Sequence, residues 1–371
     1  MERVIMWIMA AGAVVGGMDR IFGNRLKLGE RFEQGLILMG PTALSMVGIL
    51  CLAPLLSGVL ERCVAPACRA LGMDPGIFGG ILAIDMGGYQ LARDLSLDAR
   101  VGRYAGILVA ATLGCTISFT IPVGMGMLEK DHRPDFARGI LFGLIAMPPA
   151  LLLGGLMTGL SLPETCLNSL PVLVLSGLLL LCILKFTDAA IRGFGVFARI
   201  IQILTTLGLM LGAVRYMTGL SLLPGLTPIE DGMAVAASIG IVMLGSLPVA
   251  ELLRRALEKP LGWAARHTGM NSASVTGLLI GMVSVVPAIV LVRDMDRRGR
   301  VVNAAFLVCG ASGLAAHLGF TAGVEENMIL PMLASKLLGG FLGVILALLG
   351  TRGMYAAGEV GNSASKTRLP G

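Results

Sequence analysis

Asp85 is the one charged residue in an apolar, glycine-rich stretch, GIFGGILAIDMGGYQLA, at residues 76–92. A charge at membrane depth costs roughly 3 kcal/mol on insertion scales, so such residues are usually kept for a pathway or a binding site. The alternative is structural, a buried helix whose aspartate pairs with an arginine of a neighbouring helix. Glycines favour a broken or re-entrant backbone here, which is tolerated at this depth only inside protein or beside a cavity. They are Gly79, Gly80, Gly87 and Gly88.

A carboxylate beside an aromatic ring suits a small organic cation. Tyr89 follows Asp85 by one turn if the segment is helical there, and together they would hold an ammonium group by ion pairing and cation–π contact. Tyr89 equally fits an aromatic residue at the membrane interface. Asp85 and Tyr89 are the first two predicted substrate-binding residues.

Hydroxyl groups in a later apolar run could supply further ligands. TISFTIPVG, at residues 116–124, places three hydroxyls before Pro122, whose ring frees a carbonyl one turn earlier. Hydroxyls and free carbonyls hold ammonium or Na⁺, although a hydroxyl in a membrane helix often bonds its own i−4 carbonyl instead. The predicted binding residues in this run are Thr116, Ser118 and Thr120.

Ser284 and His317 complete the predicted substrate-binding set. A single intramembrane histidine can relay protons, or it can bond a neighbouring helix in its neutral form. The sequence predicts no cofactor and no metal site, because the three histidines and seven cysteines form no ligand cluster. It contains no nucleophile constellation or nucleotide loop, so the chain is not predicted to be an enzyme.

The composition places these residues in a membrane. Of 371 residues, 55% are hydrophobic and 14% charged, with a mean hydropathy of +0.84, whereas soluble domains carry about 25% charged residues. The predicted fold class is therefore an all-α polytopic membrane protein. The net charge of +6 comes without the basic stripe and aromatics of a nucleic-acid binder. The first apolar run lacks a small-residue cleavage site, so it is interpreted as a retained helix and not a signal peptide.

Nine apolar runs are predicted as spanning helices, which need about 20 residues each. They are 4–18, 35–60, 104–128, 139–162, 168–186, 196–217, 232–253, 303–324 and 328–350. Two shorter or interrupted runs, 76–92 and 273–292, are predicted as helical pieces with a break in each. The transmembrane domain is predicted over 1–350, followed by a disordered cytoplasmic tail at 351–371.

Lysine and arginine in the loops set the predicted orientation, because basic loops stay in the cytoplasm. If every apolar run crossed the membrane, strongly basic loops would fall on both sides. Suppose instead that 76–92 and 273–292 each enter the membrane and return to the side from which they entered. All strongly basic loops then fall inside, and the N-terminus falls outside. This topology has nine spanning helices and two re-entrant segments, with 93–103 outside and 293–300 inside. Helices lying across the bundle are the alternative to re-entry.

An internal repeat accompanies this pattern. Residues 46–103 match 243–300 without a gap at a shift of 197 positions, with 17 identities over 58 positions, where chance would give roughly 5. The repeats are predicted to extend over about 46–127 and 243–324. Their first helices run in opposite directions in the predicted topology, so the repeats would be inverted, as in secondary transporters with a midplane site. The alternative is a simple gene duplication in which the second copy serves only as a structural scaffold.

Several stretches resemble the ethanolamine-utilization transporter family of the EutH type. They run in order through nearly the whole membrane region: FEQGLILMG (32–40), MVGILCLAPLL (46–56), DMGGYQLA (85–92), TISFTIPVG (116–124), PGLTPI (224–229), EKPL (258–261), MDRRGRVVNAAF (295–306) and HLGFTA (317–322). The resemblance implies a bacterial inner-membrane permease that brings ethanolamine to catabolic enzymes. It assigns no binding residues. The chain looks shorter than the family in two surface loops, just after residue 20 and around 218–231.

The predicted function is uptake of protonated ethanolamine by alternating access, with a midplane site near Asp85. The alternatives are a channel-like facilitator of ethanolamine and a non-transport accessory or scaffold protein of the ethanolamine-utilization system. The expected partners are ethanolamine and membrane lipid, with H⁺ or Na⁺ as the candidate coupling ion; a homo-oligomer stays open, and no nucleic acid is expected. A carrier matters most when the outside is acidic or substrate is scarce, because the protonated amine crosses lipid poorly.

Overall fold

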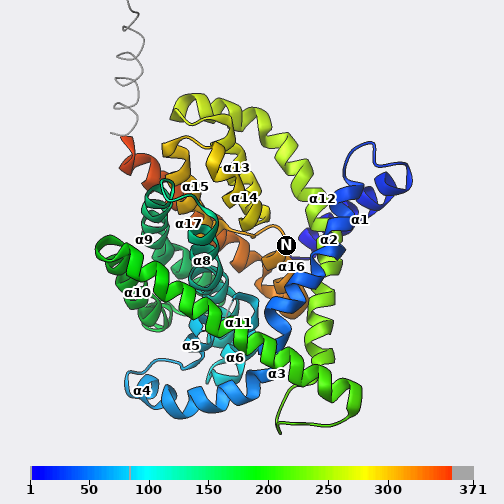
Figure 1. Ribbon diagram of the computed structural model, residues 1–371, viewed down its shortest axis with the longest axis vertical. Helices are drawn as coiled ribbons and strands as arrows, with labels where there is room; N and C mark the ends of the chain where they lie inside the picture. The colour runs from blue at the N-terminus through cyan, green and yellow to red at the C-terminus, as the bar shows by residue number, and fades with distance from the viewer. Residues whose placement is uncertain (1, 83–84, 353–371) are drawn as a thin grey trace, which may run out of the picture.

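The chain is helical throughout the part that the computed structural model describes, residues 2–82 and 85–352 (Figure 1). The all-α prediction is therefore confirmed. The α-helices are α1 Glu2–Ile21, α2 Gly29–Ile37, α3 Met39–Cys63, α4 Ala65–Ala70, α5 Gly76–Leu82, α6 Gly88–Leu95, α7 Ala99–Arg103, α8 Ile121–Met127, α9 Arg133–Met157, α10 Leu162–Lys185, α11 Thr187–Thr218, α12 Ile229–Thr268, α13 Ser272–Val283, α14 Val285–Leu291, α15 Arg297–Gly310, α16 Ala316–Val324 and α17 Ile329–Gly350. The π-helical stretches are η2 Tyr104–Gly114 and η3 Thr116–Thr120, and the 3₁₀ turns are η1 Asp85–Gly87, η4 Val292–Asp294 and η5 Glu326–Met328.

Eight helical spans in the described ranges are long and apolar enough to cross a membrane, and they coincide with eight of the nine predicted spans. The ninth prediction, one helix over 303–324, is wrong. α15 ends at Gly310 and α16 begins only at Ala316. Ser312 between them has a φ of 55°, a left-handed conformation that a continuous α-helix cannot contain.

α5 and α6 pack side by side, and the two helices together are called hairpin 1 here. The close approach requires glycine at Gly79, because a Cβ there would lie 2.4 Å from the backbone nitrogen of Ala92. The non-helical interruption predicted near Gly87–Gly88 is wrong in position, because the 3₁₀ turn η1 ends at Gly87 with helical dihedrals (φ −66°, ψ −18°) and α6 follows directly at Gly88. The residues between α5 and η1 lie outside the described ranges.

Both ends of hairpin 1 meet at one buried carboxylate, Asp74. Its Oδ1 accepts a hydrogen bond from Gly76 N (2.8 Å) at the start of α5. Its Oδ2 accepts from Leu97 N (3.0 Å) and Asp98 N (2.9 Å), just after α6. The two ends of hairpin 1 therefore lie at the same end of the bundle.

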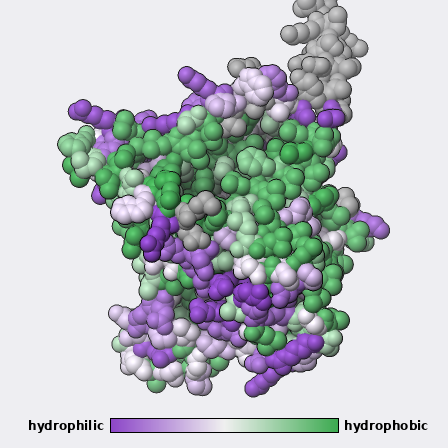
Figure 2. Space-filling model, turned by 180° about the vertical axis from the view of Figure 1, so that it is seen from behind, coloured by the Kyte–Doolittle hydropathy of each residue, from purple (hydrophilic) through white to green (hydrophobic). Residues whose placement is uncertain are grey.

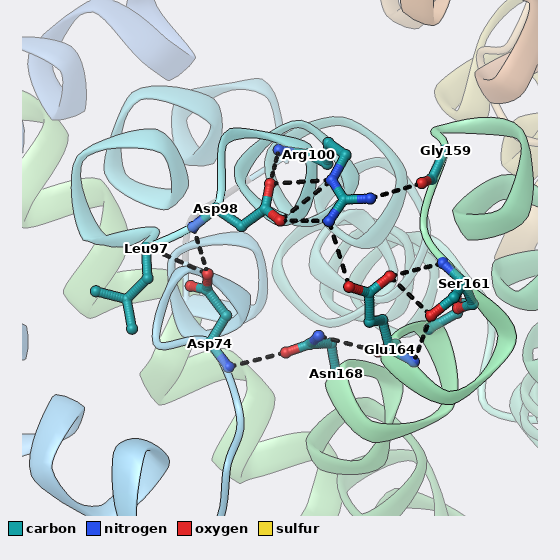
Figure 3. Close-up of polar contacts among 9 residues, drawn as sticks. Asp74, Leu97, Asp98, Arg100, Gly159, Ser161, Glu164 and Asn168 are labelled. Carbon is teal, nitrogen blue, oxygen red and sulfur yellow. Dashed lines mark hydrogen bonds and ion pairs between the residues drawn. The ribbon is translucent and has the colours of Figure 1, made fainter.

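Arg100 joins the base of hairpin 1 to the start of α10. Its Nη2 lies 2.7 Å from Asp98 Oδ2 and 3.3 Å from Glu164 Oε1, and its Nη1 donates to the Gly159 carbonyl at 2.8 Å (Figure 3). Glu164 also forms a capping box with Ser161, which fixes the first turn of α10. The loop after hairpin 1 and the loop before α10 therefore lie at the same end of the molecule.

Residues 272–291 form a second helical hairpin, hairpin 2, made of α13 and α14. The predicted break falls at Ser284, whose backbone is extended (φ −155°, ψ 137°). The base is again closed by hydrogen bonds. Asn271 caps α13, its backbone N–H donates to Asp296 Oδ1 (2.9 Å), and its side-chain amide donates to the Asp294 carbonyl (2.8 Å).

An ion pair joins the base of hairpin 2 to the start of α9. Arg297 Nε lies 3.0 Å from Asp135 Oδ1, and Arg300 Nη1 lies 3.5 Å from Asp135 Oδ2. Asp135 is buried, with 7% of its side chain exposed, and the two arginines compensate its charge. Loops 129–132 and 292–296 therefore lie at one end.

The two hairpins correspond at the shift of 197 residues. α6 begins at Gly88 and α14 at Val285, which is that shift, while α7 at Ala99 and α15 at Arg297 agree within one residue. Figure 1 places hairpin 1 toward the lower end of the long axis and hairpin 2 toward the upper end, with α16 at a height between them.

The outer surface of the bundle is largely apolar. Figure 2 shows hydrophobic residues over most of the upper and middle part of one face, with hydrophilic residues gathered lower down. Large exposed hydrophobics include Leu178 and Leu181 on α10 and Ile200 and Ile203 on α11. By contrast, every residue of η2 is buried, so η2 runs through the centre of the bundle.

Most of the predicted disordered tail, 351–371, lies outside the described residues. Its first residue does not behave as predicted, because Thr351 is buried and its hydroxyl accepts a hydrogen bond from Arg298 Nε at 3.3 Å. The ordered part of the chain thus continues past the end of α17.

Candidate functional site

The interruption between α15 and α16, residues 311–315, is held by the tip of hairpin 2. The Ser312 N–H donates to the Gly281 carbonyl (2.9 Å), and the Leu314 N–H donates to the Met282 carbonyl (2.9 Å). These bonds satisfy amides that an unbroken helix would have paired internally. The tip of hairpin 2 and the broken helix therefore form one hydrogen-bonded unit.

His317 lies directly after this interruption, in the first turn of α16. Its side chain is 1% exposed, and Nδ1 lies 3.1 Å from the Ala311 carbonyl. Because a carbonyl only accepts hydrogen bonds, Nδ1 carries a proton and donates it to the Ala311 carbonyl. This geometry fits both roles that the sequence left open, a bond between segments and a proton relay.

His317 and Thr321 lie on one face of α16, because they are four residues apart in the helix, and Glu325 follows directly after its end. These three residues are called the polar stripe here. Thr321 is 1% exposed, and its hydroxyl has no hydrogen-bond partner within the described part of the chain. Glu325, just after the helix, is partly exposed. The stripe therefore leads from the molecular surface to the central interruption.

Tyr89 of hairpin 1 covers the outer end of this stripe. Its hydroxyl donates to Glu325 Oε1 at 2.7 Å, and Arg93 Nη1 lies 3.3 Å from the same hydroxyl oxygen. Its ring meets Phe320 edge-on, with centroids 5.9 Å apart at 80°. The structure thus places Tyr89 beside a carboxylate that the sequence did not suggest.

The three predicted hydroxyl ligands differ in their surroundings. Thr116 Oγ1 bonds a carbonyl of its own helix and donates across to the Val308 carbonyl of α15 at 3.1 Å. Ser118 Oγ donates to Gly114 O at 2.7 Å, which is the structural alternative that the sequence left open. Thr120 is fully buried, and its hydroxyl has no partner among the described residues.

Lys336, in α17, lies in the same region although its side chain is 2% exposed. Its Nζ donates to the Ala111 carbonyl of η2 at 2.8 Å. Its aliphatic stem passes the interruption after α15, since a Cβ on Gly313 would lie 3.4 Å from Lys336 Cε. A buried ammonium group thus joins α17, the central π-helix and the broken helix.

A cavity of about 440 Å³ lies against the tip of hairpin 2 at Ser284. Its walls come from α2, α12 and hairpin 2, and Glu251 supplies its carboxylate. Glu251, with 7% of its side chain exposed, pairs with Arg254 (2.8 Å), Arg255 (2.9 Å) and Arg31 (3.6 Å). This cavity is far larger than a small amine, and it brings Ser284 next to a charged rim.

Comparison with known proteins identifies the family. A family model described as "Ethanolamine utilisation protein, EutH" matches residues 1–349. The chain belongs to the EutH family. A probable ethanolamine permease EutH of Listeria monocytogenes is 37% identical, with 94% of this chain and 93% of that protein covered. The corresponding protein of Escherichia coli is 33% identical over 94% of this chain and 95% of its own. An uncharacterized Bacillus subtilis protein, YxeR, is 38% identical, with 91% of each chain covered. No solved structure matches.

EutH membership gives no role to individual residues, so the site rests on the geometry. Thr116, Thr120, Ser284 and His317 lie in or beside the central region, and Tyr89 lies at the outer end of the α16 stripe. The side chain of Asp85 lies outside the described residues; its backbone begins η1. The role predicted for it stays a prediction.

Sequence reasoning missed two charged residues of this candidate site, Lys336 and Glu325. The signal for Lys336 was present, since it is a single cation inside the apolar run 328–350. Glu325 lies between two apolar runs, and nothing local in the sequence connects it with Tyr89, which is 236 positions away.

Proposed function

We propose that this EutH-family protein is an ethanolamine permease of the bacterial inner membrane, which takes up the protonated amine by alternating access. The observation that carries the proposal is the buried junction of the α15–α16 interruption, the tip of hairpin 2, Thr116 and His317. Irregular backbone at membrane depth is tolerated only inside protein or along a cavity, and transporters build their sites from it. The names of the curated relatives supply the substrate.

Ethanolamine carries an ammonium group at one end and a hydroxyl at the other. The ammonium group needs carboxylate, carbonyl or hydroxyl acceptors, and we propose Asp85 as its main partner, by a charge-assisted bond. The substrate hydroxyl needs a donor or an acceptor. The buried hydroxyls of Thr120 and Thr321, which have no partner in the described part of the chain, are suited to it.

The two halves of the proposed route differ in construction. On the outer side of the central region, the stripe from Glu325 to His317 offers polar groups along an otherwise apolar helix. On the cytoplasmic side, the cavity at Ser284 is lined by Glu251, which pairs with arginines. Tyr89 closes the outer end of this route, whereas the cavity at Ser284 lies at its cytoplasmic end. We therefore infer that the structure represents a state open to the cytoplasm.

Contacts between loops support the proposed topology. Arg100 bonds Glu164, and the predicted topology puts both residues on the outer side. Arg297 bonds Asp135, from two loops assigned to the cytoplasm. We therefore propose that the hairpins re-enter from opposite sides as parts of inverted repeats, 46–127 and 243–324, which move relative to each other during transport.

Uptake of labelled ethanolamine into proteoliposomes tests the proposal, with H⁺ and Na⁺ gradients imposed separately. If the protein is a carrier, proteoliposomes preloaded with unlabelled ethanolamine should take up the label faster than empty ones, because the carrier exchanges one molecule for the other. Uptake without this acceleration would instead identify a channel-like facilitator, and no uptake above empty liposomes would leave only an accessory role.

Two hydroxyl variants test where the site lies. Thr120→Val keeps the side-chain shape and removes a buried, unpaired hydroxyl, so the fold should be as stable or more so while the KM for ethanolamine rises several-fold. Ser118→Ala is the matched control, because that hydroxyl bonds its own helix at Gly114, and its KM should not change. Equal effects of the two substitutions would contradict the proposed site.

A further inference from the structure

Lys336 presents to the centre of the bundle the same chemical group as the proposed substrate, a primary ammonium on an alkyl chain. Its Nζ donates to the Ala111 carbonyl at 2.8 Å, within a π-helix. π-helical segments are often found at functional sites. Membrane-depth cations are expensive and are kept where they serve a pathway. A second ammonium group arriving at this carbonyl would meet a like charge at close range.

Little space is available for Lys336 to move aside. Its side chain is 2% exposed, and its Cδ and Cε pass within 3.6 and 3.4 Å of the place where a Cβ on Gly313 would lie. The neighbouring residue Ser335 donates to the Ala150 carbonyl of α9 at 2.7 Å, which fixes this turn of α17. A bound cation is therefore accommodated more readily by removing the charge of Lys336 than by displacing its side chain.

We propose that Lys336 is the proton-exchanging residue of the transport cycle, an inference that rests on the proposed function. In the empty carrier its ammonium group bonds Ala111 O. When ethanolammonium binds, Lys336–NH₃⁺ releases one proton to water, and the neutral Lys336–NH₂ accepts a hydrogen bond from the substrate ammonium through the lone pair this exposes. Release of the substrate returns the proton. One cation is thus exchanged for one proton, and the transported charge is zero.

The other ionisable groups near Lys336 are few. From α15, Cys309 is fully buried and lies within electrostatic range of Lys336. From α16 comes His317, after the interruption that Gly313 belongs to. From α9 and η2, the described ionisable residues lie at the far ends, and Glu326 of η5 lies at the exposed start of α17. Asp85 begins η1, which packs on η2, with its side chain outside the described residues.

Calorimetry of ethanolamine binding to the purified full-length protein counts the protons directly. The binding heat is measured at one pH in buffers of different ionisation enthalpy, and its slope gives the protons released per ethanolamine bound. The wild type should release about one, and its affinity should rise about tenfold per pH unit between pH 6 and 8, as exchange of one proton requires. Lys336→Met should bind with no proton release and no pH slope, and its uptake should become sensitive to membrane potential.

Lys336→Arg separates this role from a structural one. Arginine stays charged in proteins, so it cannot give up its proton, and binding should fall at least tenfold across the pH range. A purely structural lysine would predict the opposite order, with arginine milder than methionine. Ser335→Ala, which removes a buried bond from the same turn, is the matched control and should still release about one proton.

The outcomes are distinct. A wild type that binds ethanolamine with no proton release, a Lys336→Met protein that keeps the pH slope, or a Lys336→Arg protein that transports normally overturns the inference and leaves the proposed function intact. A wild type that neither binds nor transports ethanolamine rejects the proposed function itself.

Discussion

The Tyr89 hydroxyl donates a 2.7 Å hydrogen bond to Glu325 Oε1, which joins hairpin 1 to the end of α16. Tyr89 is 5% exposed and Phe320 packs edge-on against its ring. An aromatic pair and a carboxylate at the end of a buried polar stripe are the groups expected where a small cation enters.

The variant Glu325→Gln tests whether the Tyr89–Glu325 end of the polar stripe is where the substrate enters. The amide oxygen still accepts from Tyr89, but the charge that would attract ethanolammonium is lost. A charge-assisted bond is worth about 1.5–3 kcal/mol, so we expect KM to rise on the order of tenfold, with turnover at saturating substrate unchanged. Glu326→Gln removes an exposed charge from the next position and should leave KM unaltered. Equal KM values for the two variants would contradict a role for Glu325.

Asp85→Asn tests the proposed partner of the substrate ammonium. The change keeps the size of the side chain and removes its charge, so affinity should fall on the order of 10- to 100-fold, with partial recovery of uptake at high substrate. The melting temperature in detergent should hold, because an amide is cheaper to bury than a carboxylate. Normal affinity with lowered melting would assign Asp85 a structural pairing role instead.

Asp135→Asn should show the opposite pattern. Asp135 is buried beside Arg297, which is 70% exposed, and Arg300, which is 19% exposed, so solvent screens the arginines that remain and neutralising Asp135 costs about 1 kcal/mol. We expect a lower melting temperature and an unchanged KM in the protein that remains folded. A thermal scan and an uptake assay on the same preparation measure both. A KM shift without loss of stability would contradict this assignment.

Acid should weaken the base of hairpin 1 through Asp98. The hydrogen bond from the Arg100 side chain, followed by that from the Arg100 backbone, holds the pKa of this carboxyl below its usual value. Stability from a lowered pKa is present above the unfolded pKa, near 4, and is lost as the pH falls through the folded value.

Asp98→Asn should therefore melt a few degrees lower at neutral pH and lose less stability than the wild type below pH about 4. Asparagine still caps α7, so the difference reports the charge. Asp94→Asn, a nearby carboxylate bonded to Gln90 and not to Arg100, is the control. Identical acid profiles for the wild type and Asp98→Asn would exclude the ion pair as their cause.

Cysteine labelling tests the topology. Single cysteines at 97 and 294, in a background without the native cysteines, report the loops after hairpin 1 and hairpin 2. An impermeant reagent added to intact spheroplasts should label position 97 and reach 294 only after lysis. Labelling of both from the same side would refute the inverted arrangement of the hairpins.

Much of the fold could be predicted because lipid imposes simple rules. Apolar length located eight of the spans, and the glycines together with the loop charges located both hairpins. The α15–α16 interruption escaped, because its signal is a left-handed Ser312 whose amide bonds a carbonyl from hairpin 2. Local sequence periodicity does not predict such long-range hydrogen bonds. Glu325 escaped for the same reason, whereas Lys336 was visible in the sequence as a charge in an apolar run.

The two hydrogen bonds from Ser312 and Leu314 to the tip of hairpin 2 make these amides reporters of the transport cycle. If hairpin 2 withdraws when the cavity at Ser284 closes or widens, the carbonyls of Gly281 and Met282 leave with it. The two amides then become free to exchange their hydrogens with solvent. The rate of deuterium uptake at positions 312 and 314 would therefore report how readily these two hydrogen bonds open, without a substitution.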